Sequence, residues 1–231
     1  MKKEIKLVTA MAVLLAVSVN VFAQSTPNNA LFEAAKSGTV EDLKAALNSG
    51  ASVKAKDKSD YTALFLAVSQ NSNPDVVKAL LDAGSDINAK VRYGFTVLTQ
   101  TAANNKSPAA PSIIKILVDA GADVNGTDES KNTPLIWACL GSNTDNVDVI
   151  KILIDLGADV NAKNNNGLTA LKCAAGLTKT PDVIRALIDA GADKNARDRD
   201  GKRPIDSLES RYDKREFSKT DAYKEIRDLL Y

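Results

Sequence analysis

The sequence predicts an all-α fold, a solenoid of about six stacked helix-turn-helix units with β-hairpin-like connecting loops. A glycine-containing segment recurs through the 231-residue chain. A Thr-led apolar segment recurs with it, and the glycine always precedes the Thr-type position by 12 residues. Self-similarity at a period of roughly 20–50 residues is typical of solenoids. The glycine segments are LLDAGSDINAK (80–90), LVDAGADVNGT (117–127), LIDLGADVNAK (153–163) and LIDAGADKNAR (187–197), and the apolar segments begin at Thr62, Thr96, Thr133 and Thr169.

Each unit is expected to contain two short helices. The Thr-led segment opens the first helix. The second has apolar residues at helical spacing, as in DVVKALLDAG, and ends at a glycine that can take a positive φ. Pro74, Pro111 and Pro181 fit the first positions of second helices. Unit length varies only between the two helices, so the insertions there either lengthen the helices or form a ridge along one edge.

Six units follow from this spacing, and they form a single domain over residues 24–231. A helix pair of this length cannot bury its apolar face alone, whereas stacked pairs bury a continuous core. The last helix carries more charge, as expected of a cap with one face in water. The units are an N-cap repeat at 27–56, repeats at 57–90, 91–127, 128–163 and 164–197, and a C-cap unit at 198–231.

The Thr-Pro-Leu element in register with Gly-Ala-Asp-Val-Asn resembles the ankyrin repeat. The resemblance covers essentially all of residues 28–210 and implies a protein-binding solenoid whose hairpin tips and first helices form a concave surface. The family pattern has His in the fourth position of T-P-L-H, and this chain has none. The family pattern also has a glycine at the hairpin tip, and in two units of this chain Asp60 and Lys131 replace it. A left-handed backbone at Lys131 should cost about 1 kcal/mol. The residues at the His position are Phe65, Thr99, Ile136 and Lys172.

Residues 1–23 are expected to be a secretory signal peptide. Lys2, Lys3 and Lys6 precede an apolar run at 7–21, and Val21-Phe22-Ala23 offers small residues for cleavage after Ala23. The run of about 15 residues is short for a membrane anchor, which needs ~20. No cysteine follows it for a lipid anchor. The mature protein is therefore expected in the periplasm or outside the cell, without a membrane anchor.

Composition excludes several classes of function. The chain has 30 basic and 29 acidic residues, and removing the leader leaves a balance of 27 to 28. Nucleic-acid and anionic-membrane binders usually carry a basic excess, so neither partner is expected. The absence of histidine excludes His-based triads and His-ligated metals. We expect no catalytic residue, cofactor or metal.

The repeated turn offers a superficial calcium loop at Asp123–Asn125. An EF-hand needs glycine at position 6 and glutamate at position 12, and neither fits here. The recurrence of these residues in every turn favours hydrogen bonds to the backbone instead. Cys139 and Cys173 are read as small buried residues, although a disulfide stays open. Trp137 is expected in the core, with its N–H bonded to a partner.

We expect the functional residues at positions that differ between the repeats. Tyr61, Tyr93 and Phe95 lie at hairpin tips, where nothing in the repeat is expected to bury them, and exposed aromatics are typical binding anchors. Isolated surface aromatics are also common, so both interpretations stand. The full predicted surface is Tyr61, Arg92, Tyr93, Phe95, Asn132, Leu168 and Lys202 at the tips, extended by Gln70, Asn104 and Leu140 near the ends of first helices.

The predicted function is a non-enzymatic, monomeric protein-binding module. One specific form is an inhibitor or immunity protein against a toxic or wall-degrading enzyme, suggested by compartment and fold. The alternatives are a passive structural or stress-tolerance scaffold, and an enzyme with an unrecognised carboxylate site. A scaffold would lack a single stoichiometric partner, and an enzyme would need a deep pocket with perturbed carboxylates.

Overall fold

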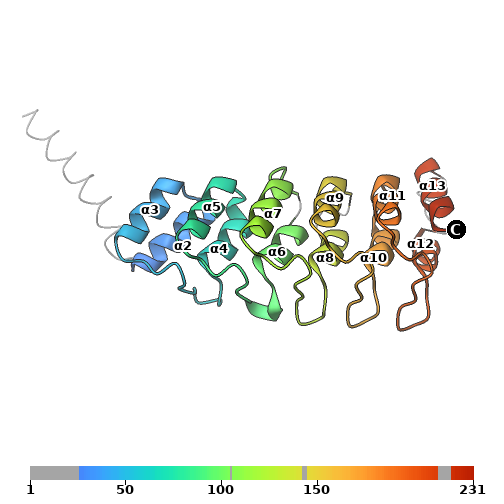
Figure 1. Cartoon of the computed structure of the whole chain (residues 1–231), viewed down its shortest axis with the longest axis horizontal. Coiled ribbons are helices and arrows are strands. Elements are labelled where there is room, and N and C mark those ends of the chain that lie inside the picture. Colours follow the sequence, from blue (N-terminus) through green and yellow to red (C-terminus); the bar gives the residue numbers. More distant parts are fainter. Residues whose placement is uncertain (1–25, 105, 142–144, 213–219) are drawn as a thin grey trace, which may run out of the picture.

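The computed structural model describes residues 26–104, 106–141, 145–212 and 220–231. The predicted signal peptide lies outside these residues. Figure 1 shows two parallel rows of helices, with the hairpin loops hanging from one side of the solenoid. The predicted all-α solenoid of stacked helix pairs is confirmed, with twelve α-helices in the described residues. None of these helices is long and apolar enough to span a bilayer.

The first-helix row opens each unit. A threonine caps each of the four central members through its side chain, as the recurrence of Thr62, Thr96, Thr133 and Thr169 predicts. The second member is unusual because a short α-turn continues into a π-helix, η1 (Ala67–Asn71). The row consists of α2 (Pro27–Ser37), α4 (Ala63–Leu66), α6 (Val97–Ala103), α8 (Pro134–Leu140), α10 (Ala170–Leu177) and α12 (Pro204–Tyr212).

The second-helix row lies behind the first. Its members hold nine or ten residues in every unit, so the insertions do not lengthen them and instead lie in the preceding connections. Pro74 and Pro181 are first helical residues, whereas Pro111 is the second residue of its helix. The row consists of α3 (Val40–Asn48), α5 (Pro74–Asp82), α7 (Ala110–Asp119), α9 (Val147–Asp155), α11 (Pro181–Asp189) and α13 (Asp221–Leu230).

Apolar residues from both rows form one continuous core. In α9, Val149, Ile150 and Leu153 are fully buried, as the helical spacing predicts. Each second helix except the last ends at a left-handed glycine with φ between +87° and +96°, which confirms the predicted stops. Among the described helices, the main contacts join members of the same unit or of neighbouring units, as expected of a nearest-neighbour stack.

An asparagine ladder joins consecutive units at the turns after the second helices. The Asn125 side chain donates to the Gly157 carbonyl (3.2 Å) and accepts from the Asp159 N–H (2.8 Å) of the next unit. Asn88 and Asn161 do the same one unit earlier and later. The preceding aspartate instead bonds within its own turn, as Asp123 does with the Asn125 N–H. Both residues therefore build structure, as expected from their recurrence.

Candidate partner-binding site

The hairpin loops are shaped by the first residue of each tip. Asp57 Oδ1 accepts hydrogen bonds from the N–H groups of Ser59 (2.8 Å) and Tyr61 (3.0 Å), which closes a tight Asx-type turn. In two other tips, the side chains of Asn164 and Asp198 likewise accept from the N–H groups two and four residues later. Asp128 accepts only from the N–H four residues later, that of Asn132. The described residues form no β-strand here, only an isolated bridge between Lys56 and Thr62.

The fourth residue of every tip adopts a left-handed conformation. Gly94, Gly167 and Gly201 do so at φ +73° or +74°. Asp60 (φ +69°) and Lys131 (φ +60°) adopt it without being glycine, which confirms that they occupy the glycine position. All five tips therefore share this left-handed position, whichever side chain occupies it.

The second hairpin departs from the others because Val91 replaces the side-chain acceptor. Val91 is buried, and the chain turns instead through a 3-10 segment, η2 (Arg92–Gly94). Tyr93 consequently takes a left-handed conformation at φ +62° and ψ +19°. It stands 65 % exposed, and the only other large hydrophobic residue this open in the described part of the chain is Tyr231.

A groove of about 340 Å³ lies beside this hairpin, between the second and third units. It brings together five residues of the predicted surface: Tyr61, Gln70, Arg92, Tyr93 and Phe95. The rest of the lining comes from first helices and consists of Phe65, Leu66, Ser69 and Gln100. None of these four was predicted as a contact residue, although their position in the Thr-led segments could have indicated them.

Two aromatic pairs make the walls of the groove rigid. Tyr61 stacks on Phe65 with ring centroids 4.9 Å apart, and Phe95 packs tilted against Trp137 at the same distance. Tyr61 and Phe95 are therefore half-buried, and the expectation that nothing in the repeat buries them is wrong. Tyr93 alone projects freely, with the Arg92 guanidinium 5.8 Å from its ring centroid.

The π-helix η1 forms the floor of the groove. Ser69 Oγ donates to the Phe65 carbonyl (2.7 Å), and the Ser69 carbonyl accepts from the Asn104 side chain (3.1 Å). Asn71 reaches back to the Gly38 carbonyl in the same way (3.0 Å). Asn104, predicted as a contact residue, thus holds the floor against the next unit. π-turns are frequent at functional sites.

The other predicted contact residues lie away from the groove. Asn132 is only 7 % exposed, and its side chain donates to Asp128 (2.9 Å) and accepts from Asn164 (2.8 Å). Leu140 and Leu168 are half-buried against the core. Lys202 is exposed at the last tip. The structure therefore gathers five of the ten predicted residues into one site.

The residues considered for other chemistry have structural roles. Trp137 is half-buried, and its indole N–H donates to Asp128 (3.0 Å), which supplies the expected partner. Cys139 and Cys173 are buried free thiols. Burial raises the pKa of the Cys173 thiol to about 12. No group of three or more Cys, Asp or Glu side chains among the described residues could hold a metal ion.

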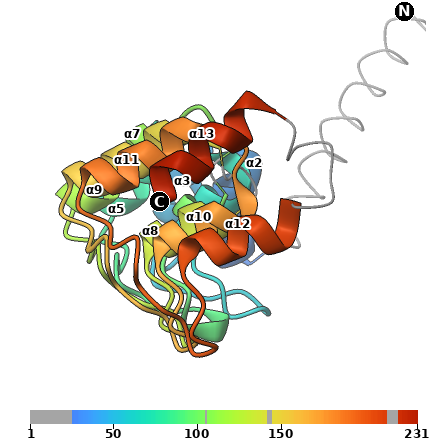
Figure 2. The same ribbon diagram turned by 90° about the vertical axis from the view of Figure 1, so that its right-hand side faces the viewer.

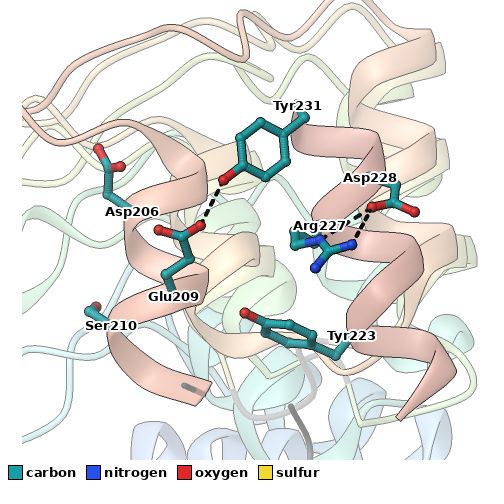
Figure 3. A pocket seen from close by; sticks show the side chains of 7 residues that line it. All are labelled: Asp206, Glu209, Ser210, Tyr223, Arg227, Asp228 and Tyr231. Atoms are coloured by element: carbon teal, nitrogen blue, oxygen red, sulfur yellow. Dashed lines mark hydrogen bonds and ion pairs between the residues drawn. The ribbon is translucent and has the colours of Figure 1, made fainter. Parts of the chain in front are cut away.

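A second hollow of about 650 Å³ opens between α12 and α13. Figure 3 shows its carboxylates turned toward neighbouring side chains: Tyr231 donates to Glu209 (3.0 Å), and Arg227 binds Asp228 (3.0 Å). Asp206 caps its own helix, and the bond from the Arg203 N–H lowers the pKa of its carboxyl. These side chains form the outer face of the terminal unit. Each of the three carboxylates is hydrogen-bonded or ion-paired, so this hollow offers no free acid–base pair.

Comparison with known proteins agrees with this geometry. A family model for ankyrin repeats, three copies in length, matches residues 6–91 and 98–198. A search of curated proteins finds no significant match. The matched segments include the asparagine ladder, whereas Arg92, Tyr93 and Phe95 of the groove fall between them, so this part of the site is a variation within a recognised repeat architecture.

Proposed function

The chain belongs to the ankyrin-repeat family of protein-interaction modules, and on that basis we propose that it binds another protein without catalysing a reaction. The observation that carries the proposal is Tyr93, which is exposed above a groove with rigid aromatic walls. An aromatic side chain beside a preformed pocket is typical of binding hot spots, because little side-chain entropy is lost on association.

The left-handed backbone at Tyr93 supports the same assignment. A bulky residue in that conformation costs about 1–2 kcal/mol, and backbone strain of this kind concentrates at binding sites. A serine, asparagine or aspartate occupies the equivalent position in the other tips. The chain thus bears a local cost that places one aromatic ring in solvent.

The test is a capture experiment with a matched pair of variants. The Tyr93→Ala variant should lose the partner that the natural protein retains, while its melting temperature should stay the same because the ring packs on no core residue. The matched control is Tyr231→Ala, which removes the other exposed aromatic residue, 70 % exposed at the C-terminal end of the solenoid, and should leave capture unchanged. Equal capture by the natural protein and the Tyr93→Ala variant would contradict the proposal.

We further propose that the protein acts in the periplasm or outside the cell after cleavage behind Ala23. The lysine-led apolar run of residues 1–23 supports this. Mass spectrometry of the protein from its natural host should find Gln24 at the N-terminus. An intact Met1 or Lys2 terminus on the whole population would contradict it.

Inhibition of a toxic or wall-degrading enzyme is the specific role that we propose within this function. Support comes from the combination of compartment and fold, which is an argument by analogy. A captured hydrolase should lose activity when the natural protein is added and keep it with the Tyr93→Ala variant. Full activity of the captured enzyme in both cases would reject inhibition and leave binding intact.

A further inference from the structure

Charge is distributed unevenly between the two sides of the solenoid. We define the hairpin edge as residues 54–61, 90–95, 127–132, 163–168 and 197–203. It holds eleven Lys or Arg and six Asp or Glu residues. The four central second helices, α5, α7, α9 and α11, hold seven acidic and four basic residues. Figure 2 shows the hairpin edge projecting away from the second-helix row, so a chain that is neutral overall has one basic edge.

Most acidic side chains of the hairpin edge are already engaged. The Asp57 carboxylate accepts two backbone N–H groups, and Asp60 pairs with Lys56 (2.9 Å). Asp128 is buried beneath Trp137, and Asp198 pairs with Lys172 (3.1 Å). The Asp60 pair also occupies Lys56 of the same edge, and Glu129 and Asp200 stay exposed, so the edge keeps a smaller basic excess.

The basic side chains at the tips remain available. Lys58, Arg92, Lys131 and Lys202 are exposed, and none of them forms an ion pair with another described residue. The first three stand on consecutive tips, on either side of the groove. Exposed charge of one sign steers a partner of opposite sign and fixes its orientation.

Backbone hydrogen bonds join the second, third and fourth tips into a continuous support for such a partner. The Glu129 N–H donates to the Tyr93 carbonyl (3.1 Å), and the Asn165 N–H donates to the Ser130 carbonyl (2.9 Å). Stacked helices lie ~8–10 Å apart, and a polyproline-II segment advances ~3.1 Å per residue with about three residues per turn, so every third side chain faces the same way. A polyproline-II segment that crosses the stack therefore presents one side chain to each tip about every three residues.

We propose that the partner presents a polyproline-II segment with an acidic side chain at about every third residue, and that these acidic side chains pair with Lys58, Arg92 and Lys131. An apolar side chain between the first two acids enters the groove beside Tyr61 and Tyr93. This inference rests on the proposed function and specifies the class of protein surface that the same site binds.

The probe for this inference is a fluorescein-labelled synthetic peptide, Thr-Glu-Leu-Thr-Glu-Thr-Thr-Glu-Thr, whose glutamates have the required spacing. Fluorescence anisotropy should give a Kd at least tenfold lower than for the peptide with Gln in place of Glu. Replacing Leu by Ala in the peptide should also weaken binding. Because exposed pairs are screened, about 0.5 M salt should reduce the preference for the acidic peptide.

Protein variants locate the binding peptide on the edge. The Arg92→Gln and Lys131→Gln variants should each raise the Kd about threefold to tenfold. The matched control is Lys151→Gln, which removes an exposed charge from α9 on the opposite row and should leave the Kd unchanged. Equal binding of the acidic and amide peptides, or an equal effect of Lys151→Gln, overturns the inference. So does the absence of saturable binding, or tighter binding of a uridine oligonucleotide.

The two proposals fail in different ways. If the peptide does not bind but Tyr93→Ala still abolishes partner capture, the acidic-segment inference is wrong and the protein-binding function stands. If Tyr93→Ala has no effect on capture, the proposed site itself is wrong, whatever the peptide does.

Discussion

The Lys172 ammonium lies 3.1 Å from the Asp198 carboxylate across the joint between the last two units. The Lys172 and Asp198 side chains are only 5 % and 10 % exposed, and Lys172 also donates to the carbonyls of Lys202 and Arg203. Lys172 occupies the position where the family pattern has histidine. A longer cation thus secures the neighbouring hairpin, so the missing histidine is replaced here by an ion pair.

Removing one partner of this pair should destabilise the protein. The Lys172→Leu variant leaves Asp198 without its cation, and we expect a loss of about 2 kcal/mol of unfolding free energy. This is below the range for fully enclosed pairs because the hairpin lies near solvent. Adding Asp198→Asn should recover part of the loss, as urea denaturation would measure. A double variant as unstable as the sum of the single ones would contradict coupling between the two side chains.

The same carboxylate should make stability depend on pH. Burial alone raises the pKa of Asp198, but the hydrogen bonds from the Lys202 N–H and the Lys172 ammonium outweigh burial and hold it below its ordinary value of 3.8. The unfolded chain therefore binds more protons in acid. The stabilisation is complete above about pH 5 and is lost as the pH falls through the folded-state pKa. The Asp198→Asn variant should show a smaller fall in unfolding free energy below pH 4 than the natural protein, and an unchanged slope would refute this.

Two glycines of the first-helix row should respond oppositely to alanine. A Cβ at Gly141 would overlap the Ala103 carbonyl oxygen of the preceding unit, whereas one at Gly176 would lie 3.7 Å from Ser207 Cβ. Gly141→Ala should cost about 1–3 kcal/mol through overpacking. Gly176→Ala should be neutral or stabilising by roughly 0.5–1 kcal/mol, because alanine favours the helix. Thermal unfolding of both variants measures this contrast, and similar melting temperatures would contradict it.

Restoring the usual acceptor at the second tip should affect binding more than stability. The Val91→Asp variant can accept the N–H bonds that shape the other hairpins, which should remove the left-handed conformation of Tyr93 and turn its ring away from the groove. Partner capture should fall severalfold while the melting temperature changes little. A Val91→Ala variant controls for the lost apolar contact. Unaltered capture by Val91→Asp would show that the backbone of this tip does not orient Tyr93.

The buried thiols should be inert in the native protein. Burial raises the pKa of both Cys139 and Cys173, so little reactive thiolate forms. A thiol reagent should label neither residue before unfolding and both afterwards, without added reductant. Labelling that requires reductant would reveal a disulfide in the natural protein and correct the structure at this point.

Repeated residues made the fold predictable, because each cap, stop and tip occurs several times in a fixed register. The site was harder to predict because it depends on residues that occur once. Tyr93 could be found as an unusual residue at a tip, but the effect of Val91 on its backbone could not. The burial of Asn132 was also missed, because its partners Asp128 and Asn164 belong to two different units. Pairing across units depends on the stacking geometry, which sequence spacing does not specify.

The asparagine ladder has a consequence for the order in which the units unfold. It begins at Asn88, since Lys54 occupies the equivalent place in the first turn and, among the described residues, makes neither of the two bonds that Asn125 makes. The first unit is joined to the second by apolar packing and by the Asn71 bond to Gly38. Amide hydrogens of α2 and α3 should therefore exchange faster than those of α8 and α9, whose unit is held by ladder bonds on both sides.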